Sequence, residues 1–234
     1  MRQDAHRRTT LADVPDGRAW RPESFGDGRQ ARTTAGRVSL IRALLPDILS
    51  SNLLVVFVGT AKSTASARAG HYYANPRNMF WDLLRATGLT GGIQIGPGDD
   101  RTVLDFGVGL TDLVSDRAAS SDGMLRAGDF DVPGFVGRME ENRPLVVAFN
   151  GGNATSRVAR YLGHTDPPEG PIEWTIAGSP AYRLPSSSSA NATGGYQAKR
   201  AKWAAFGEWV EALSGRQGLA GPGRAERSDQ DGTG

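Results

Sequence analysis

The sequence predicts an α/β protein with three layers, α/β/α, around a central, mainly parallel sheet of four strands. Short apolar runs alternate with amphipathic helical patterns along residues 37–214. Two of these runs, Leu53–Val58 and Leu145–Phe149, are apolar on both faces, as expected for strands covered by helices on both sides. A chain of 234 residues also has the length of one such domain with tails.

The strands are bounded by turn-forming residues. The first apolar strand ends at Gly59, and the second ends at Asn150, which two glycines follow. Two further strands, Glu173–Ala177 and Tyr182–Leu184, are expected on either side of a Gly-Ser-Pro turn. Residues 103–109 are expected to form a turn or a short strand that leads into the segment 110–114.

Helices are expected where apolar residues recur every three to four positions. Gly88, Pro144 and Gly163 supply the stop signals of three of them. The aromatic residues of the last helix have helical spacing and are expected in the core. In chain order, the expected helices are 39–49 with an interruption at Pro46, Asn78–Thr87, Phe135–Glu141, Ser156–Leu162 and Gln197–Leu213.

The two ends of the chain differ in composition from the middle. Residues 1–36 lack apolar periodicity and residues 215–234 are Gly-rich and polar, so both are expected to be disordered around a folded domain at 37–214. Nine Arg and five acidic residues give residues 1–42 a charge of +4, against +2 for the whole chain. This basic arm is either a solvated tail or a salt-sensitive contact to phosphates.

Composition excludes several classes of protein. The chain has no Cys, so disulfides, thiolate catalysis and Cys-based metal centres are ruled out, and its three His are dispersed. The longest apolar run is much shorter than the ~20 residues of a membrane span, and no secretory signal is visible. We therefore expect a cytoplasmic protein, associated with the nucleoid if bacterial.

Ligands of such sheets bind beyond the carboxyl ends of the strands. Three loops leave these ends, at 59–76, 150–153 and 185–195. The first combines small residues with Tyr72 and Tyr73, a combination that suits a flat ligand. The third begins with a run of serines and is either a flexible linker or a phosphate-binding loop.

Four segments in order resemble motifs of the uracil-DNA glycosylase superfamily, in its mismatch-specific branch (bacterial mismatch uracil glycosylase and thymine-DNA glycosylase). Residues 54–82, LVVFVGTAKSTASARAGHYYANPRNMFWD, are similar to the first motif, a strand followed by GINPG and a GHxYxxPxNxFW stretch. Residues 104–114, 147–151 and 184–190 resemble the segments GIGFTN, VFNGK and MPSSSAR. The resemblance spans about residues 44–212.

The resemblance implies a monofunctional DNA glycosylase of base excision repair. Such an enzyme flips a deaminated or mismatched base, here most simply uracil, out of DNA and hydrolyses its N-glycosidic bond. The implied partner is double- or single-stranded DNA with a damaged base, bound by a monomer that needs no metal or organic cofactor.

Site roles carried over from the family fall into two groups. Tyr73 would stack on the base. The rest of the base pocket would be formed by Thr60, Ala61, Ser66, Asn78 and Asn150. DNA would be held by Ser186, Ser187, Ser188 and Lys199, with Ala190 or Asn191 at the position that fills the vacated stack.

The first motif departs from the family pattern. Ala61 stands where the family has the Asn that positions water, and Lys62 replaces the Pro. Asp112, which aligns with a pocket Asn of thymine-DNA glycosylase, is the first candidate for the missing catalytic group, although an N-cap or surface role would also suit it. His71, as a donor to the leaving base, is the second. Lys62 as an amine nucleophile would instead make the protein a lyase.

Two other functions stay open at this point. A protein of the same fold that has lost hydrolysis would bind lesions or DNA without cutting. A nucleotide hydrolase or another small-molecule α/β enzyme is disfavoured, because the chain has no GxxxxGK[ST] phosphate loop and no paired acids for Mg²⁺.

Overall fold

The computed structural model describes residues 45–119, 121–189 and 194–216. Its sheet has the strand order β2-β1-β3-β5-β4. The strands are β1 (Val55–Ser63), β2 (Val108–Ala119), β3 (Val146–Asn150), β4 (Gly170–Ile176) and β5 (Ser179–Leu184). The α-helices are α2 (Thr64–Ala69), α3 (Phe80–Ala86), α4 (Val132–Asn142), α5 (Gly152–Tyr161) and α6 (Gly195–Arg216), and 3₁₀ segments lie at Pro97–Phe106, Asp122–Met124 and Ala127–Asp129.

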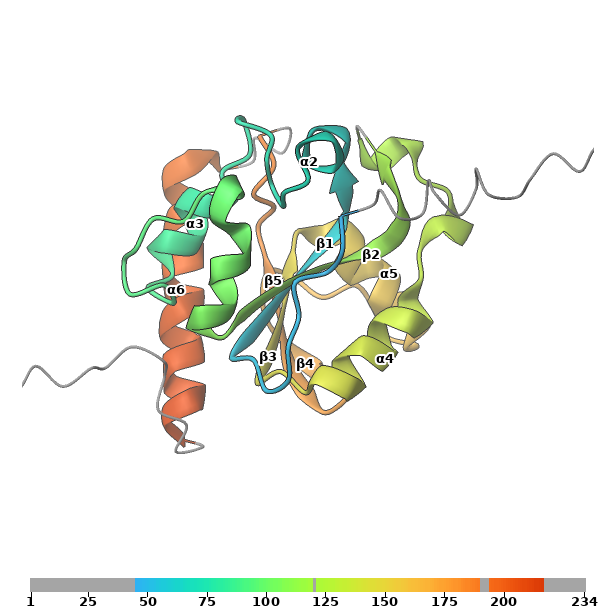
Figure 1. The fold of residues 1–234 in the computed structure, drawn as a ribbon. Helices are drawn as coiled ribbons and strands as arrows, with labels where there is room; N and C mark the ends of the chain where they lie inside the picture. Colours follow the sequence, from blue (N-terminus) through green and yellow to red (C-terminus); the bar gives the residue numbers. More distant parts are fainter. Residues whose placement is uncertain (1–44, 120, 190–193, 217–234) are drawn as a thin grey trace, which may run out of the picture. The chain divides into compact units, whose positions relative to one another are not determined.

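The predicted fold class is confirmed. Helices α3 and α6 cover one face of the sheet, and α4 and α5 cover the other (Figure 1). Strands β2, β1, β3 and β5 run parallel to one another, and β4 adds an antiparallel edge next to β5. The sheet therefore has five strands rather than the four expected.

Strand β1 shows how the sequence produces the layers. Successive side chains of a strand point to opposite faces. Val55 and Phe57 pack in the core under α3 and α6, where the Phe57 ring stacks on Trp203 at a centroid distance of 5.5 Å. Val56 and Val58 pack in the second core, under α4 and α5. The aromatic residue Trp203 of the last helix is fully buried, as predicted.

Two expectations about local structure are wrong. Residues 59–63 do not begin a loop but continue β1, because the twelve-residue β2 offers a partner as far as Ala119. Helix α2 then starts at once, with the Ser63 side chain accepting a hydrogen bond from Ser66 N as an N-cap. Residues 45–50 are not helical, since Ile48 forms an antiparallel bridge to Leu110.

Several predictions fall on other parts of the chain. The arm at 1–36, the start of the helix expected at 39–49, and Ala190 and Asn191 lie outside the described residues, as does the tail beyond Arg216. Within the described ranges, no helix combines the length and the apolar character that crossing a membrane requires.

Candidate functional site

A pocket with a volume of about 70 Å³ lies beside the carboxyl-terminal half of β1. One water molecule needs roughly 10–15 Å³ on the same measure, so the pocket has room for about five water-sized groups. It brings together five of the predicted site residues with three others. Its lining consists of Ala61, Lys62, Ser63, Ser66, Tyr72, Tyr73, Asn78 and Asp112.

Asp112 is the acidic group of this pocket and is only 3% exposed. Its Oδ2 atom lies 3.5 Å from Lys62 Nζ and makes no hydrogen bond within the described residues. Gly59 makes room for it, because a Cβ at that position would lie 2.1 Å from Asp112 Oδ1. Burial raises the pKa of Asp112 to about 6, although the Lys62 ammonium opposes the shift. The carboxyl is therefore ionised at neutral pH and protonated in weak acid.

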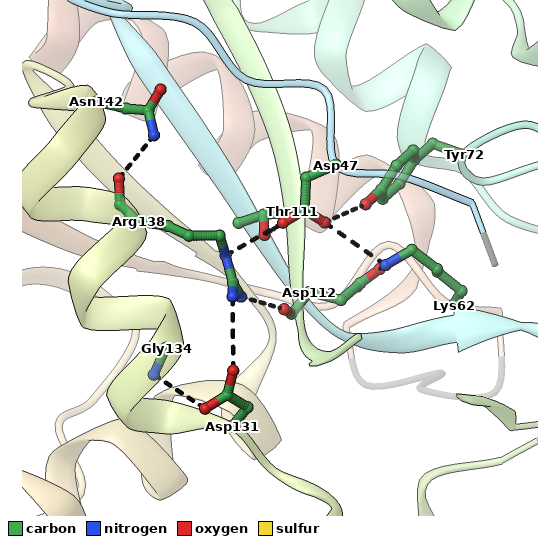
Figure 2. A network of polar contacts seen from close by, with 9 residues as sticks. All are labelled: Asp47, Lys62, Tyr72, Thr111, Asp112, Asp131, Gly134, Arg138 and Asn142. Carbon is green, nitrogen blue, oxygen red and sulfur yellow. Dashed lines mark hydrogen bonds and ion pairs between the residues drawn. The ribbon is translucent and has the colours of Figure 1, made fainter. Parts of the chain in front are cut away.

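A network of buried and partly buried charges surrounds Asp112 (Figure 2). The Lys62 ammonium lies between two carboxylates, 3.5 Å from Asp112 and 3.6 Å from Asp47. Asp47 in turn accepts hydrogen bonds from Tyr72 Oη at 3.1 Å and from Thr111 Oγ1 at 2.8 Å. It also pairs with Arg138 Nε of α4 at 3.1 Å. No sequence pattern marks Asp47, Thr111 or Arg138 as residues of the site.

Tyr73 presents a strained and partly covered aromatic ring. Its φ of 51° lies in the left-handed region, which costs a non-glycine residue about 1 kcal/mol or more. The ring stacks on Phe80 at a centroid distance of 3.8 Å, so at most one face is open to a base. Its buried hydroxyl makes no hydrogen bond of regular geometry among the described residues. Burial, and then the charge of Asp112, raises the pKa of Tyr73 well above its ordinary value, although the Asn150 side chain is close enough to oppose the shift slightly, so this hydroxyl keeps its proton.

Asn78 adds a hydrogen-bond donor to the pocket. Its Oδ1 accepts a hydrogen bond from Phe80 N at 3.0 Å, at the start of α3. That bond fixes which end of the amide is the acceptor. The Nδ2 group of Asn78 is thereby left as a donor that no other described residue uses.

Two buried residues hold the loop that carries these groups. Ser66 Oγ accepts hydrogen bonds from Ser63 Oγ at 2.9 Å and from Ala74 N at 3.2 Å. Asp100 accepts one from Tyr72 N at 2.8 Å. Ser66 therefore anchors the loop as well as lining the pocket.

The structure leaves three of the residues predicted for catalysis or base binding outside the pocket lining, namely His71, Thr60 and Asn150. His71 Nδ1 lies 3.4 Å from Asp100 Oδ1, and the His71 side chain is 40% exposed. Thr60 Oγ1 donates a hydrogen bond to Asp122 Oδ2 at 3.3 Å. Among the described residues, no group of three or more His, Asp or Glu is placed to hold a metal ion.

The serine loop, residues 185–189, lies next to this site. Asn150 at the end of β3 exchanges two hydrogen bonds with Ser187, each 2.8 Å long. Met79 N donates to Ser187 O at 3.0 Å, which joins the serine loop to the loop that carries Tyr73. Asn150 thus shapes the serine loop and does not line the pocket, and Ser187 is only 1% exposed. Ser186 and Ser188 are partly exposed.

Lys199 does not fit its expected role as a direct phosphate contact. It is only 2% exposed, and its Nζ donates to Ser186 O at 2.8 Å and to Ser188 O at 3.1 Å. Burial lowers the pKa of Lys199 from its ordinary value. The ammonium stabilises the serine loop from inside the protein, because backbone carbonyls take its hydrogen bonds.

Comparison with known proteins identifies a family and a similar solved structure. A sequence model of the uracil DNA glycosylase superfamily matches residues 46–210. The solution NMR structure of a candidate uracil DNA glycosylase from Methanosarcina acetivorans is similar to this chain, with a TM-score of 0.50 and 25% sequence identity. That alignment covers 72% of this chain and 97% of the archaeal one.

Proposed function

Because the chain belongs to the uracil DNA glycosylase superfamily, we propose that it is a monofunctional DNA glycosylase of base excision repair. It flips a deaminated or mismatched base, with uracil as the main expected substrate, out of DNA and hydrolyses the N-glycosidic bond. The observation that carries this proposal is the pocket in which the Asp112 carboxylate is buried, with no hydrogen bond to its Oδ2 atom among the described residues. Buried polar atoms are rarely left unpaired, so such an atom beside a pocket points to a ligand or a bound water that completes its hydrogen bonds.

The pocket has the donors that a departing base requires. As the glycosidic bond breaks, negative charge builds up on the carbonyl oxygens of the base. Asn78 Nδ2 and the Tyr73 hydroxyl are neutral donors that stabilise this charge, and the base is supported by the face of the Tyr73 ring that does not stack on Phe80.

Asp112 supplies the attack on the sugar. Its carboxylate orients a water molecule against C1′ and takes a proton from it, while its negative charge stabilises the oxocarbenium-like transition state. The C1′–O bond forms, the C1′–N bond breaks, and the base leaves as an anion that is then protonated. The methyl group of Ala61 cannot orient water, so the acid on β2 takes over that task.

The mismatch-specific branch is the best match for the motifs. The order of the four segments and the uninterrupted spacing from Gly59 to Trp81 support it. In this branch the substrate would be uracil or another deaminated base opposite a mismatched partner, presented in duplex DNA whose phosphates lie along Ser186 and Ser188.

One observation favours a second candidate, a lesion-binding protein that does not cut. Ala61 stands at the position of the family's water-positioning Asn, and such a replacement is expected in a protein that has lost hydrolysis. Such a protein would bind uracil-containing DNA tightly and release no base.

A glycosylase assay decides between the two. Oligonucleotides with uracil, hypoxanthine or a G·T mismatch are incubated with the wild type and with Asp112→Asn, and free base is measured. We expect release by the wild type and a loss of about 10²–10⁴-fold in the variant, the usual contribution of a general base. Unchanged release by the variant would refute the role of Asp112, and tight binding without release by the wild type would support the lesion binder.

A further inference from the structure

Lys62 is a buried cation that lines a pocket expected to receive a base, and the hydrolysis described above makes no use of it. We infer that Lys62 is a positioning residue that keeps Asp112 ionised and fixed in the pocket, and that it is not a nucleophile. This inference rests on the proposed function of Asp112 and assigns the control of that same site.

The balance of charges in the network carries the inference. Two carboxylates, Asp47 and Asp112, face two cations, Lys62 and Arg138. Asp47 has hydrogen bonds from two hydroxyl groups besides its ion pairs. The Asp112 carboxylate has Lys62 as its ion-pair partner and no hydrogen bond to Oδ2 within the described ranges. Lys62 is therefore the group on which the charge of Asp112 depends.

The other elements around Asp112 stabilise the negative charge of its carboxylate less than Lys62 does. From the segment before β1, Asp47 adds a second negative charge that disfavours ionisation of Asp112. From α4, Arg138 favours ionisation, but its guanidinium donates to the backbone oxygen of Asp112 and not to the carboxylate. The hydroxyls of Tyr72 and Tyr73, from the loop after α2, are neutral.

The same geometry argues against Lys62 as a nucleophile. An amine must lose its proton before it can attack a sugar carbon. Carboxylates at 3.5 and 3.6 Å stabilise the ammonium form. The Tyr72 ring, whose centroid is 5.5 Å from Nζ, adds a cation–π contact that favours the same charged form.

Opposite shifts are expected from the two neighbours of Asp112. Lys62→Met removes the nearby cation, so the acid limb of the rate profile should move to higher pH by about one to three units. On that limb each unit lowers the rate about tenfold. Asp47→Asn removes the nearby anion and should move the limb to lower pH. The double variant should return toward the wild type, and Lys62→Arg should stay close to it.

The experiment measures single-turnover base release against pH for these four variants and the wild type. Lys202→Met is the control, because Lys202 pairs with Glu169 on the surface. In parallel, ¹³C NMR titration of the Asp112 carboxyl, assigned with Asp112→Asn, follows its ionisation without any need for activity. Asp47→Asn keeps the test open if Lys62→Met does not fold.

The outcomes separate this inference from the proposed function. Shifts of opposite sign in the Lys62 and Asp47 variants support the inference. Shifts of the same sign, or none, overturn it, as does an adduct with abasic DNA that borohydride traps in the wild type and not in Lys62→Met. If the wild type releases no base while the NMR titration shows the opposite shifts, the proposed function fails and the coupling of Lys62 to Asp112 stands.

Discussion

The charged wall, defined as the pocket residues Lys62 and Asp112 with Asp47 and Arg138 behind them, and the serine loop use polar groups in opposite ways. In the serine loop these groups satisfy each other, since Asn150 pairs with Ser187 and the Lys199 ammonium binds backbone carbonyls. In the charged wall, Asp112 Oδ2 is buried without a hydrogen bond within the described residues. The serine loop is therefore built for rigidity, and the wall keeps a polar atom available at a cost in stability.

The two aspartates of the wall show the same contrast at short range. Lys62 lies at nearly the same distance from each, 3.6 Å from Asp47 and 3.5 Å from Asp112. Asp47 also receives hydrogen bonds from Tyr72 and Thr111. The distance to Lys62 therefore does not distinguish Asp47 from Asp112. The hydrogen bonds from Tyr72 and Thr111 do, because they occupy Asp47 and leave Asp112 available to a ligand.

The largest effect should come from filling the space that Asp112 needs. In Gly59→Ala the new Cβ would lie 2.1 Å from Asp112 Oδ1, so the carboxylate must move. We expect single-turnover base release to fall at least about a hundredfold, the order of magnitude for a displaced general base. Gly96→Ala is the control, because a Cβ there meets no atom within 4 Å. Equal activity of the two variants would contradict the placement of Asp112.

The stability cost of the wall can be measured through its pH dependence. The pKa of Asp112 is about 6 in the folded protein, against 3.8 as its ordinary value, so the native state binds more protons between these pH values. Folding stability should therefore fall as pH rises through this window, by up to about 3 kcal/mol from this group. Asp112→Asn, which cannot ionise, should exceed the wild type in stability at pH 7.5 and lose most of that advantage at pH 4.

Urea unfolding of the wild type and of Asp112→Asn at the two pH values provides this measurement. All other acids titrate in both proteins, so their contributions cancel in the difference between the two free energies of unfolding. A stability difference that does not change with pH would mean that burial does not control the ionisation of Asp112.

A smaller effect, and a different kinetic signature, should follow from loosening the serine loop. Asn150→Ala leaves the buried Ser187 N–H without its partner, at a cost of about 1–3 kcal/mol. We expect KM for DNA to rise about tenfold, equivalent to ~1.4 kcal/mol, with kcat nearly unchanged. Asn153→Ala, which removes only an exposed hydrogen bond to Asp122, serves as the control. A fall in kcat alone would place Asn150 with the chemistry of the wall.

The smallest effect concerns the salt dependence of DNA binding. A phosphate contact changes the slope of log K against log [salt] by about 0.9. Because Lys199 is buried against carbonyls, Lys199→Gln should change that slope by much less than one such contact, whatever it does to affinity. Fluorescence anisotropy at several salt concentrations gives the slope, and a decrease of about 0.9 would restore Lys199 to the DNA-binding surface.

The layers of the fold could be read from the sequence because local patterns encode them. Leu53–Val58 and Leu145–Phe149 are apolar on both faces, and such runs are stable only between two layers of helices. The end of β1 could not be read in this way, because Thr60–Ser63 is polar and its strand partner, the far end of β2, lies more than fifty residues away. The N-cap at Ser63 was a local signal that the sequence analysis missed.

The candidate site was predictable only in part. The family resemblance led to Tyr73, Asn78 and Asp112, which line one pocket. The charges that surround Asp112 come from segments far apart in the chain, at Asp47 and Arg138, and no motif links them. Lys62 gave no such signal either, because it stands in the polar stretch after Gly59, where the sequence did not indicate a buried strand.

The close approach of Gly59 to Asp112 also constrains how the two positions can change during evolution. A side chain gained at position 59 forces the acid at position 112 to move, because the two cannot occupy the same space. Shortening or losing the acid first removes this conflict, and the glycine can then be replaced. Across related sequences, an acid held in this position should therefore occur mainly together with glycine at position 59.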